Sequence, residues 1–248
     1  ARVVADAGAY PAIGAVLPLL TMQLSQAGYD IPAIDFFAQS VVTNTTFIGA
    51  YRGAGRPEAT QMVERVLDKA AAAIGMDPAE IRRKNYLQPD AFPLTTLVGA
   101  NYDSGEYERS LDAVLEASGY SELRAEQTRR RETNDPMLLG IGVSSYVEVT
   151  APIGLHVEYG SCEINDDGSA TIKVGTSSHG QGHDTAFSML VNDVLGIPMD
   201  QVNHVDADTE TVARGSGTMG SRSLQAGGSA VYEASKVVLE KGKQLSLI

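Results

Sequence analysis

Three short loops of this 248-residue chain carry the residue types and spacings that could do chemistry. They span residues 49–57, 175–184 and 214–223, and each combines glycines with polar or cationic side chains. Glycine lets a ligand approach the backbone N–H groups, and arginine adds a planar fork of donors. Each loop also leads towards an expected helix, whose N-terminus attracts anions. We therefore expect the three loops to converge on one elongated ligand that is anionic or bears oxo groups.

Each loop offers a different donor to such a ligand. The first, AYRGAGRP, contains Arg52 and Arg56. The second, GTSSHGQGHD, offers Gln181, whose amide can both donate to and accept from the edge of a heterocycle. The third ends in the tripeptide Ser-Arg-Ser at 221–223, which suits a phosphate, although Ser221 would serve equally well as a helix N-cap.

Other familiar sites are not indicated by these loops. His179 and His183 lie four residues apart, but Gly180 and Gly182 disfavour the helix that would bring both rings to one face. No cysteine or carboxylate stands at a ligand spacing beside them, so we predict no metal bound by protein side chains. The glycine patterns also differ from the phosphate loop of nucleotide-binding proteins, the dinucleotide fingerprint and the serine-hydrolase elbow.

The elements expected to position the first loop are mainly helical. A β-branched stretch at 41–48 predicts a strand before it, and apolar residues at helical spacing predict a helix from Pro57 to Ile74 that ends at Gly75. Further helices are predicted from Asp77 as N-cap, at 106–118 and at 121–133.

The second half changes character near residue 134. Alternation at 141–149 and 155–159, a turn signal at 165–168 and alternation at 170–174 predict an antiparallel sheet over 137–174. Helices are expected after the second and third loops, with a short strand at 202–205 between them. The prediction is an α+β fold with helices packed on mixed or antiparallel sheets, in two parts, 1–134 and 135–248.

Composition narrows the class of protein. The formal net charge of −12 argues against binding to nucleic acid or to an anionic membrane surface. The apolar run at 12–24 contains Pro18 and is too short to span a bilayer. A single cysteine, Cys162, excludes an internal disulfide and favours a reducing cytoplasm. The sequence opens on Ala1 in mid-pattern, so we expect a piece of a longer chain.

Five segments together resemble one protein family. TNTTFIGAYRGAGRPEA, ERVLDKAAAAIGMDPAEIRRKN, YDSGEY, GQGHDT and GSGTMGSRS occur in the order found in the molybdopterin-binding large subunit of the xanthine oxidase family, and the match covers nearly the whole chain. The nearest branch resembles the large chain of carbon monoxide dehydrogenases of form II. The resemblance implies a molybdenum hydroxylase whose cofactor is molybdopterin cytosine dinucleotide, with partner subunits that carry iron–sulfur clusters and FAD.

The resemblance also implies roles for individual residues. Arg52 would place a fixed positive charge beside the oxo ligands of molybdenum and is the candidate catalytic residue. The remaining positions would bind the cofactor: Gly53, Ala54 and Gly55 near the oxo groups, Gly180, Gln181 and Gly182 at the pterin, and Thr218, Ser221, Arg222 and Ser223 at the pterin or pyrophosphate.

Two departures from the family pattern shape the expected activity. Copper-containing carbon monoxide enzymes have a cysteine where this chain has Gly53, and Cu(I) prefers a thiolate, so no copper is expected. Hydroxylation of a small aldehyde or N-heterocycle fits better than carbon monoxide oxidation. The family's glutamate base, in a C-terminal glycine-rich motif, is missing, and periodicity places Glu148 and Glu158 on the solvent side. The isolated chain is therefore expected to be inactive and free of cofactor.

Two alternatives remain at this point. The chain could be a non-catalytic scaffold or assembly module that keeps the loops but binds no cofactor, as Gly53 and the missing base would allow. It could also bind a nucleotide unrelated to molybdenum, because three anion-favouring loops do not by themselves identify the anion.

Overall fold

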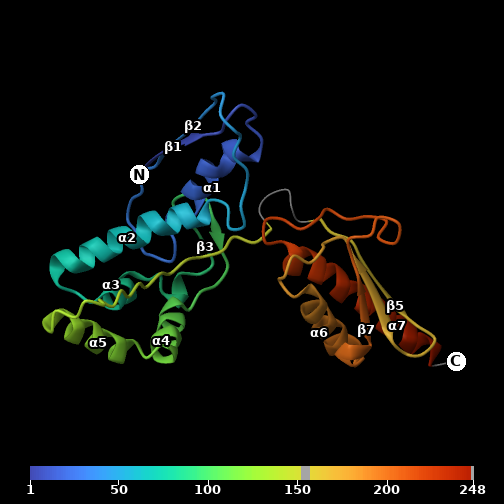
Figure 1. Ribbon diagram of the computed structural model, residues 1–248. Helices are drawn as coiled ribbons and strands as arrows, with labels where there is room; N and C mark the ends of the chain where they lie inside the picture. The colour runs from blue at the N-terminus through green and yellow to red at the C-terminus, as the bar shows by residue number, and fades with distance from the viewer. Residues whose placement is uncertain (152–156, 247–248) are drawn as a thin grey trace. The chain divides into compact units, whose positions relative to one another are not determined.

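The computed structural model describes residues 1–151 and 157–246 and divides the chain into two compact units, residues 1–148 and 149–248 (Figure 1). The boundary expected near residue 134 therefore lies inside the first unit. The segment after it bonds to side chains of that unit: Gln127 Nε2 donates to the Leu139 carbonyl at 3.0 Å, and the Ser145 N–H donates to Glu64 Oε2 at 3.0 Å.

The first unit opens with two parallel strands, β1 (Arg2–Asp6) and β2 (Phe37–Val41). The strand expected at 41–48 is wrong in position, because the ladder ends at the pair Asp6–Val41. Beyond it, the hydroxyls of Thr43 and Thr45 donate to the Asp6 carboxylate, which turns the chain away from the ladder. Between the strands lie a 3₁₀ turn (Ile13–Val16) and α1 (Leu17–Gln23).

Four longer helices follow in the first unit and confirm the predicted ones. They are α2 (Arg56–Ile74), α3 (Pro78–Asn85), α4 (Tyr107–Ala117) and α5 (Tyr120–Glu132). Gly75 ends α2 in a left-handed conformation, and the Asp77 carboxylate caps α3 by accepting from the Ala79 N–H at 2.8 Å. A 3₁₀ turn (Pro89–Ala91) and the short antiparallel strands β3 (Leu94–Thr95) and β4 (Asn101–Tyr102) connect α3 to α4.

The second unit is a small mixed sheet covered by helices. β5 (Gly160–Ile164) and β6 (Ala170–Val174) are antiparallel, and β7 (Val202–Val205) is parallel to β6. The 3₁₀ turn Met199–Gln201 leads into β7, and the π-helix Ser223–Gly228 leads into α7 (Ser229–Leu245). Helix α6 (His183–Leu195) and α7 meet the same sheet face, since Ile172 and Val174 pack with Phe187, Val191 and Val231.

The antiparallel sheet predicted for 137–174 is only partly present. Residues 160–174 form the predicted hairpin, but 141–149 form no strand. Exposure does alternate along 141–149, as the sequence indicated, but in place of pairing with a strand the segment packs Val143 on a buried cluster that includes Tyr29 and Tyr86. Leu155 lies outside the described residues. The α+β prediction is confirmed, and within the described residues no helix is long and apolar enough to cross a membrane.

Candidate functional site

The arginine loop, residues 51–55, is a tight turn that leads into α2. The Ala54 N–H donates to the Tyr51 carbonyl at 2.8 Å, and the Arg56 N–H donates to the Gly53 carbonyl at 2.8 Å. Gly53 and Gly55 have φ of 102° and 84°, a left-handed backbone that favours glycine. Among the residues that the structure describes, the Gly53 N–H has no acceptor, whereas that of Ala54 is used within the turn. The loop therefore offers a ligand the Gly53 N–H.

The two arginines that flank this turn differ in their surroundings. Arg52 is exposed, and its side chain can reach a ligand. Arg56 is the first residue of α2, and its guanidinium forms an ion pair with Glu148, the two side chains being 13% and 34% exposed. Glu148 is therefore on the outer side of its segment, as predicted, but it is engaged with Arg56.

The two polar loops of the second unit lie side by side. Thr218 Oγ1 donates to the Ser177 carbonyl at 2.7 Å and accepts from the Ser177 N–H at 2.8 Å. Gly175 and Gly215 meet backbone to backbone, and a Cβ on Gly175 would lie 2.3 Å from the Gly215 Cα. The structure thus brings the second loop (175–184) and the third loop (214–223) together, which is one part of the predicted convergence. The arginine loop belongs to the other unit, so its convergence with these two stays a prediction.

The start of α6 has the features of an anion cradle. Gly180 and Gly182 have φ of 90° and 75°, and open space surrounds each where a Cβ would stand. Among the described residues no side chain caps the helix, which leaves N–H groups of its first turn for a ligand. Gln181 lies between the glycines and accepts from the His179 N–H through Oε1, which leaves its amide nitrogen for a ligand.

Two buried polar groups beside this cradle lack partners. Thr176 Oγ1 and both ring nitrogens of His183 are buried without a hydrogen bond in the part of the chain that the structure describes. Buried polar groups are costly when left unpaired, so a polar ligand that reached these atoms would relieve that cost. Together with the open glycines and the uncapped helix, these groups fit a polar, anionic cofactor. Sequence reasoning did not single out Thr176, although its place inside the second loop, 175–184, was a usable signal.

His183 is held neutral by its surroundings. Burial lowers its pKa, and the neighbouring His204 ring lowers it further, while Asp206 and Asp184 act in the opposite direction. The His204 ring is engaged through Nδ1 with the Asp184 carboxylate. Within residues 1–151 and 157–246, no three His, Cys, Asp or Glu side chains gather as metal ligands.

The third loop is fixed by an internal ion pair. Arg222 is fully buried, and its guanidinium contacts the Glu158 carboxylate and donates to the Gly217 carbonyl at 2.6 Å. The prediction that Glu158 faces solvent is wrong, because its side chain is 0% exposed and its charge is compensated by Arg222. Ser221 is exposed with a left-handed φ of 53°, and Ser223 begins the π-helix.

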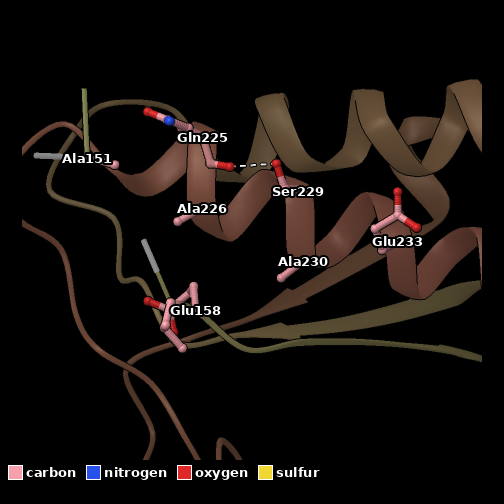
Figure 2. A pocket seen from close by; sticks show the side chains of 8 residues that line it. Ala151, Glu158, Gln225, Ala226, Ser229, Ala230 and Glu233 are labelled. Atoms are coloured by element: carbon pink, nitrogen blue, oxygen red, sulfur yellow. Dashed lines mark hydrogen bonds between the residues drawn. The ribbon is translucent and has the colours of Figure 1, made fainter. Parts of the chain in front are cut away.

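A cavity of about 600 Å³ lies beside this ion pair, between residue 158 and the start of α7 (Figure 2). Glu158, Gln225 and Glu233 supply its polar wall, and small residues such as Ala226 and Ala230 leave the space open. The Ser229 hydroxyl is turned to the Gln225 carbonyl, 2.5 Å away. None of the predicted cofactor residues lines this cavity.

Comparison with known proteins gives consistent matches over the chain. Residues 113–247 match the family model of the molybdopterin cofactor-binding domain, and residues 1–86 match a second model with the same description. The carbon monoxide dehydrogenase large chain of Hydrogenophaga pseudoflava is 37% identical over 260 residues, which cover 99% of this chain and 32% of that protein. The nicotine 6-hydroxylase large subunit of Paenarthrobacter nicotinovorans is 35% identical, with 95% of this chain and 30% of that protein covered.

Among solved structures, quinoline 2-oxidoreductase from Pseudomonas putida 86 matches with a TM-score of 0.87 and 30% identity, covering 98% of this chain and 32% of that one. Carbon monoxide dehydrogenase from Oligotropha carboxidovorans matches with a TM-score of 0.82 and 30% identity, covering 98% and 32%. The chain spans about a third of the length of the relatives it matches.

Proposed function

Because the chain belongs to the family of molybdopterin cofactor-binding domains, we propose that it forms part of the cofactor site in a molybdenum hydroxylase large subunit. The proposed reaction is hydroxylation of a small aldehyde, N-heterocycle or similar molecule. The observation that carries the proposal is the paired loops at the start of α6, where Gly180 and Gly182 are open and the buried Thr176 hydroxyl and His183 ring have no hydrogen-bond partner among the described residues.

The chain's own residues have separable tasks in this proposal. The cofactor, when bound, would supply the redox chemistry, with water as the oxygen source. Gly180 and Gly182 admit it to the backbone, and Gln181 offers its amide to the pterin. Arg52 would provide a fixed positive charge beside the oxo groups, together with the Gly53 N–H.

The third loop would bind the pterin or pyrophosphate mainly through its backbone and hydroxyls. Ser221 and Ser223 remain proposed cofactor contacts, and Thr218 would contribute while holding the loop to Ser177. Arg222 is buried and paired with Glu158, so we propose that it supports the third loop from within the unit. Its contribution to cofactor binding would then be indirect, through the loop that its guanidinium holds in place.

The proposed cofactor form is molybdopterin cytosine dinucleotide, without copper. Gly53 offers no thiolate in the arginine loop. Cys162 lies in β5, and burial raises the pKa of its thiol, which disfavours the thiolate that Cu(I) requires. The proposed partners are iron–sulfur and FAD subunits that accept the electrons, in the cytoplasm. No glutamate of this chain is proposed as the general base, so the chain alone would be inactive.

The proposal is tested by measuring molybdenum and cytidine nucleotide per large subunit in the native protein, not in this chain by itself. We expect about one of each in the wild type and a loss of most of both in Gln181→Ala. Gln201→Ala, an exposed glutamine in the same unit, is the matched control and should retain both. Absence of molybdenum from the wild type would instead support a non-catalytic scaffold, and an adenine nucleotide in its place would support an unrelated nucleotide binder.

A further inference from the structure

An extended segment of the first unit, residues 137–148, lies along its helices; we call it the strap. In Figure 1 it is the yellow-green trace that follows α5 and runs alongside α2 in the opposite direction. Side chains hold its backbone at intervals: Arg130 Nη1 donates to the Met137 carbonyl at 3.0 Å, and Gln127 Nε2 donates to that of Leu139 at 3.0 Å. Val143 packs on the core of the unit.

Glu64, on α2, binds the strap near its end. Its Oε1 accepts from the Tyr29 hydroxyl at 2.6 Å, while Oε2 accepts from Arg82 Nε at 2.7 Å and from the Ser145 N–H at 3.0 Å. Glu64 and Arg82 are 5% and 0% exposed, so the pair is shielded from water. Arg82 also donates to the half-buried Asp68 at 2.9 Å. Glu64 and Arg82 neutralise each other's charge. The hydrogen bond from the Ser145 N–H to Glu64 is therefore an additional contact of this carboxylate.

Two contacts set the register of the strap on α2. Glu64 holds Ser145, and Arg56 holds Glu148. Glu64 is eight positions after Arg56 in the helix, about 12 Å at a rise of about 1.5 Å per residue. Glu148 is three positions after Ser145 in extended chain, about 10 Å at about 3.3 Å per residue. The spacings agree to within side-chain reach, and a slip of one residue, about 3.3 Å, would break the hydrogen bond at Ser145.

From this geometry we propose that Glu64 is a positioning residue for the arginine loop. By fixing the strap through Ser145, it delivers Glu148 to Arg56, and Arg56 anchors the turn that holds Arg52 and Gly53. The relevance of this turn to catalysis rests on the proposed function, but the mechanical link between Glu64 and the turn does not.

Hydrogen exchange of the Ala54 and Arg56 amides in the native protein tests the link, since both are bonded within the turn. Ser145→Pro removes the N–H that donates to Glu64 but leaves the ion pair of Glu64 with Arg82 intact. Proline is also compatible with the extended backbone of the strap. We expect exchange of both amides to accelerate about tenfold. Ser145→Ala, the matched control, loses the hydroxyl contact with Tyr86 but keeps the N–H, and should stay within about twofold of the wild type.

Glu148→Gln leaves every bond of Glu64 in place and provides the second variant. It should accelerate the same two amides about as much as Ser145→Pro, and the double variant should add little, because both changes act through one path. Unchanged exchange in Glu148→Gln, or in a folded Ser145→Pro, would overturn the proposal, as would full additivity. Molybdenum content does not enter these outcomes, so a protein without molybdenum would refute the proposed function and leave this test standing.

Discussion

Replacing Glu158 by glutamine should destabilise residues 149–248 by about 3–5 kcal/mol, because it removes the carboxylate of a fully buried ion pair. The Arg222 side chain is 0% exposed, and so is that of Glu158. The carbonyls of Gly217 and Val157, which also accept from the guanidinium, are neutral. Glu158 Oε1 also accepts from the Ser216 N–H at 3.1 Å, so the substitution loosens the third loop as well.

Exchange of the Ile172 and Val174 amides measures this cost. Both residues are fully buried in β6, and their slow exchange reports the opening of the second unit's core. A loss of about 3–5 kcal/mol corresponds to exchange about 100- to 5,000-fold faster. This readout is preferable to a melting temperature, because a chain of two units need not unfold in one step.

Glu233→Gln is the matched control for this measurement. Glu233 also pairs with a cation in the second unit, but Glu233 and its partner Lys236 are 65% and 49% exposed. Such a pair contributes about 0–1 kcal/mol, so exchange should change less than about fivefold. If Glu158→Gln behaves like this control, the buried pair is not what holds the third loop, and the structural role given to Arg222 is refuted.

Two further changes separate steric and titration effects. Gly55→Ala should lower the stability of α2 by about 2–4 kcal/mol, because its Cβ would lie 2.6 Å from Leu20 Cβ at a left-handed φ. Gly75→Ala also has a left-handed φ but meets open space, so it should lower that stability by only about 1 kcal/mol. Equal losses of α2 stability, measured by hydrogen exchange, would contradict this prediction. His183→Gln should flatten the pH dependence of the second unit. Because the folded pKa of His183 is lowered, the unfolded chain binds more protons, and stability should fall as pH drops below about 6.5 in the wild type; an unchanged slope in the variant would count against it.

Local signals in the sequence were sufficient for most helices of the fold. Pro57 and Gly75 mark the ends of α2, and Asp77 caps α3 as its position before a proline indicated. These signals work because the first and last turns of a helix are satisfied by residues a few positions away. The signals for the strand at 202–205 were equally local, because its two valines and the turn before it are neighbours in the sequence.

Long-range partners were beyond the reach of the same reasoning. Alternation along 141–149 correctly indicates which side chains face inward, but it does not say what they contact, and the Ser145 hydroxyl contacts that of Tyr86, 59 residues away. Nor does it reveal the acceptor of the Ser145 N–H, the Glu64 carboxylate, 81 residues away. Glu158 was placed in solvent for the same reason, since periodicity carries no information about Arg222. The sequence offers one hint of such a buried pair: Glu158 lies within an apolar alternation, and Arg222 lies in a glycine-rich loop.

The arginines singled out by the sequence prove to have two different tasks. Arg56 and Arg222 are each engaged by a carboxylate of their own unit, Glu148 and Glu158, so their charges shape loops. In the proposed function, recognition of the anionic cofactor then falls mainly on Arg52 and on backbone N–H groups at the loops and the start of α6. Backbone donors are fixed by the fold and carry no net charge, which reconciles an anionic ligand with a chain of net charge −12. Cofactor retention in this protein should accordingly depend more on loop geometry than on ionic strength.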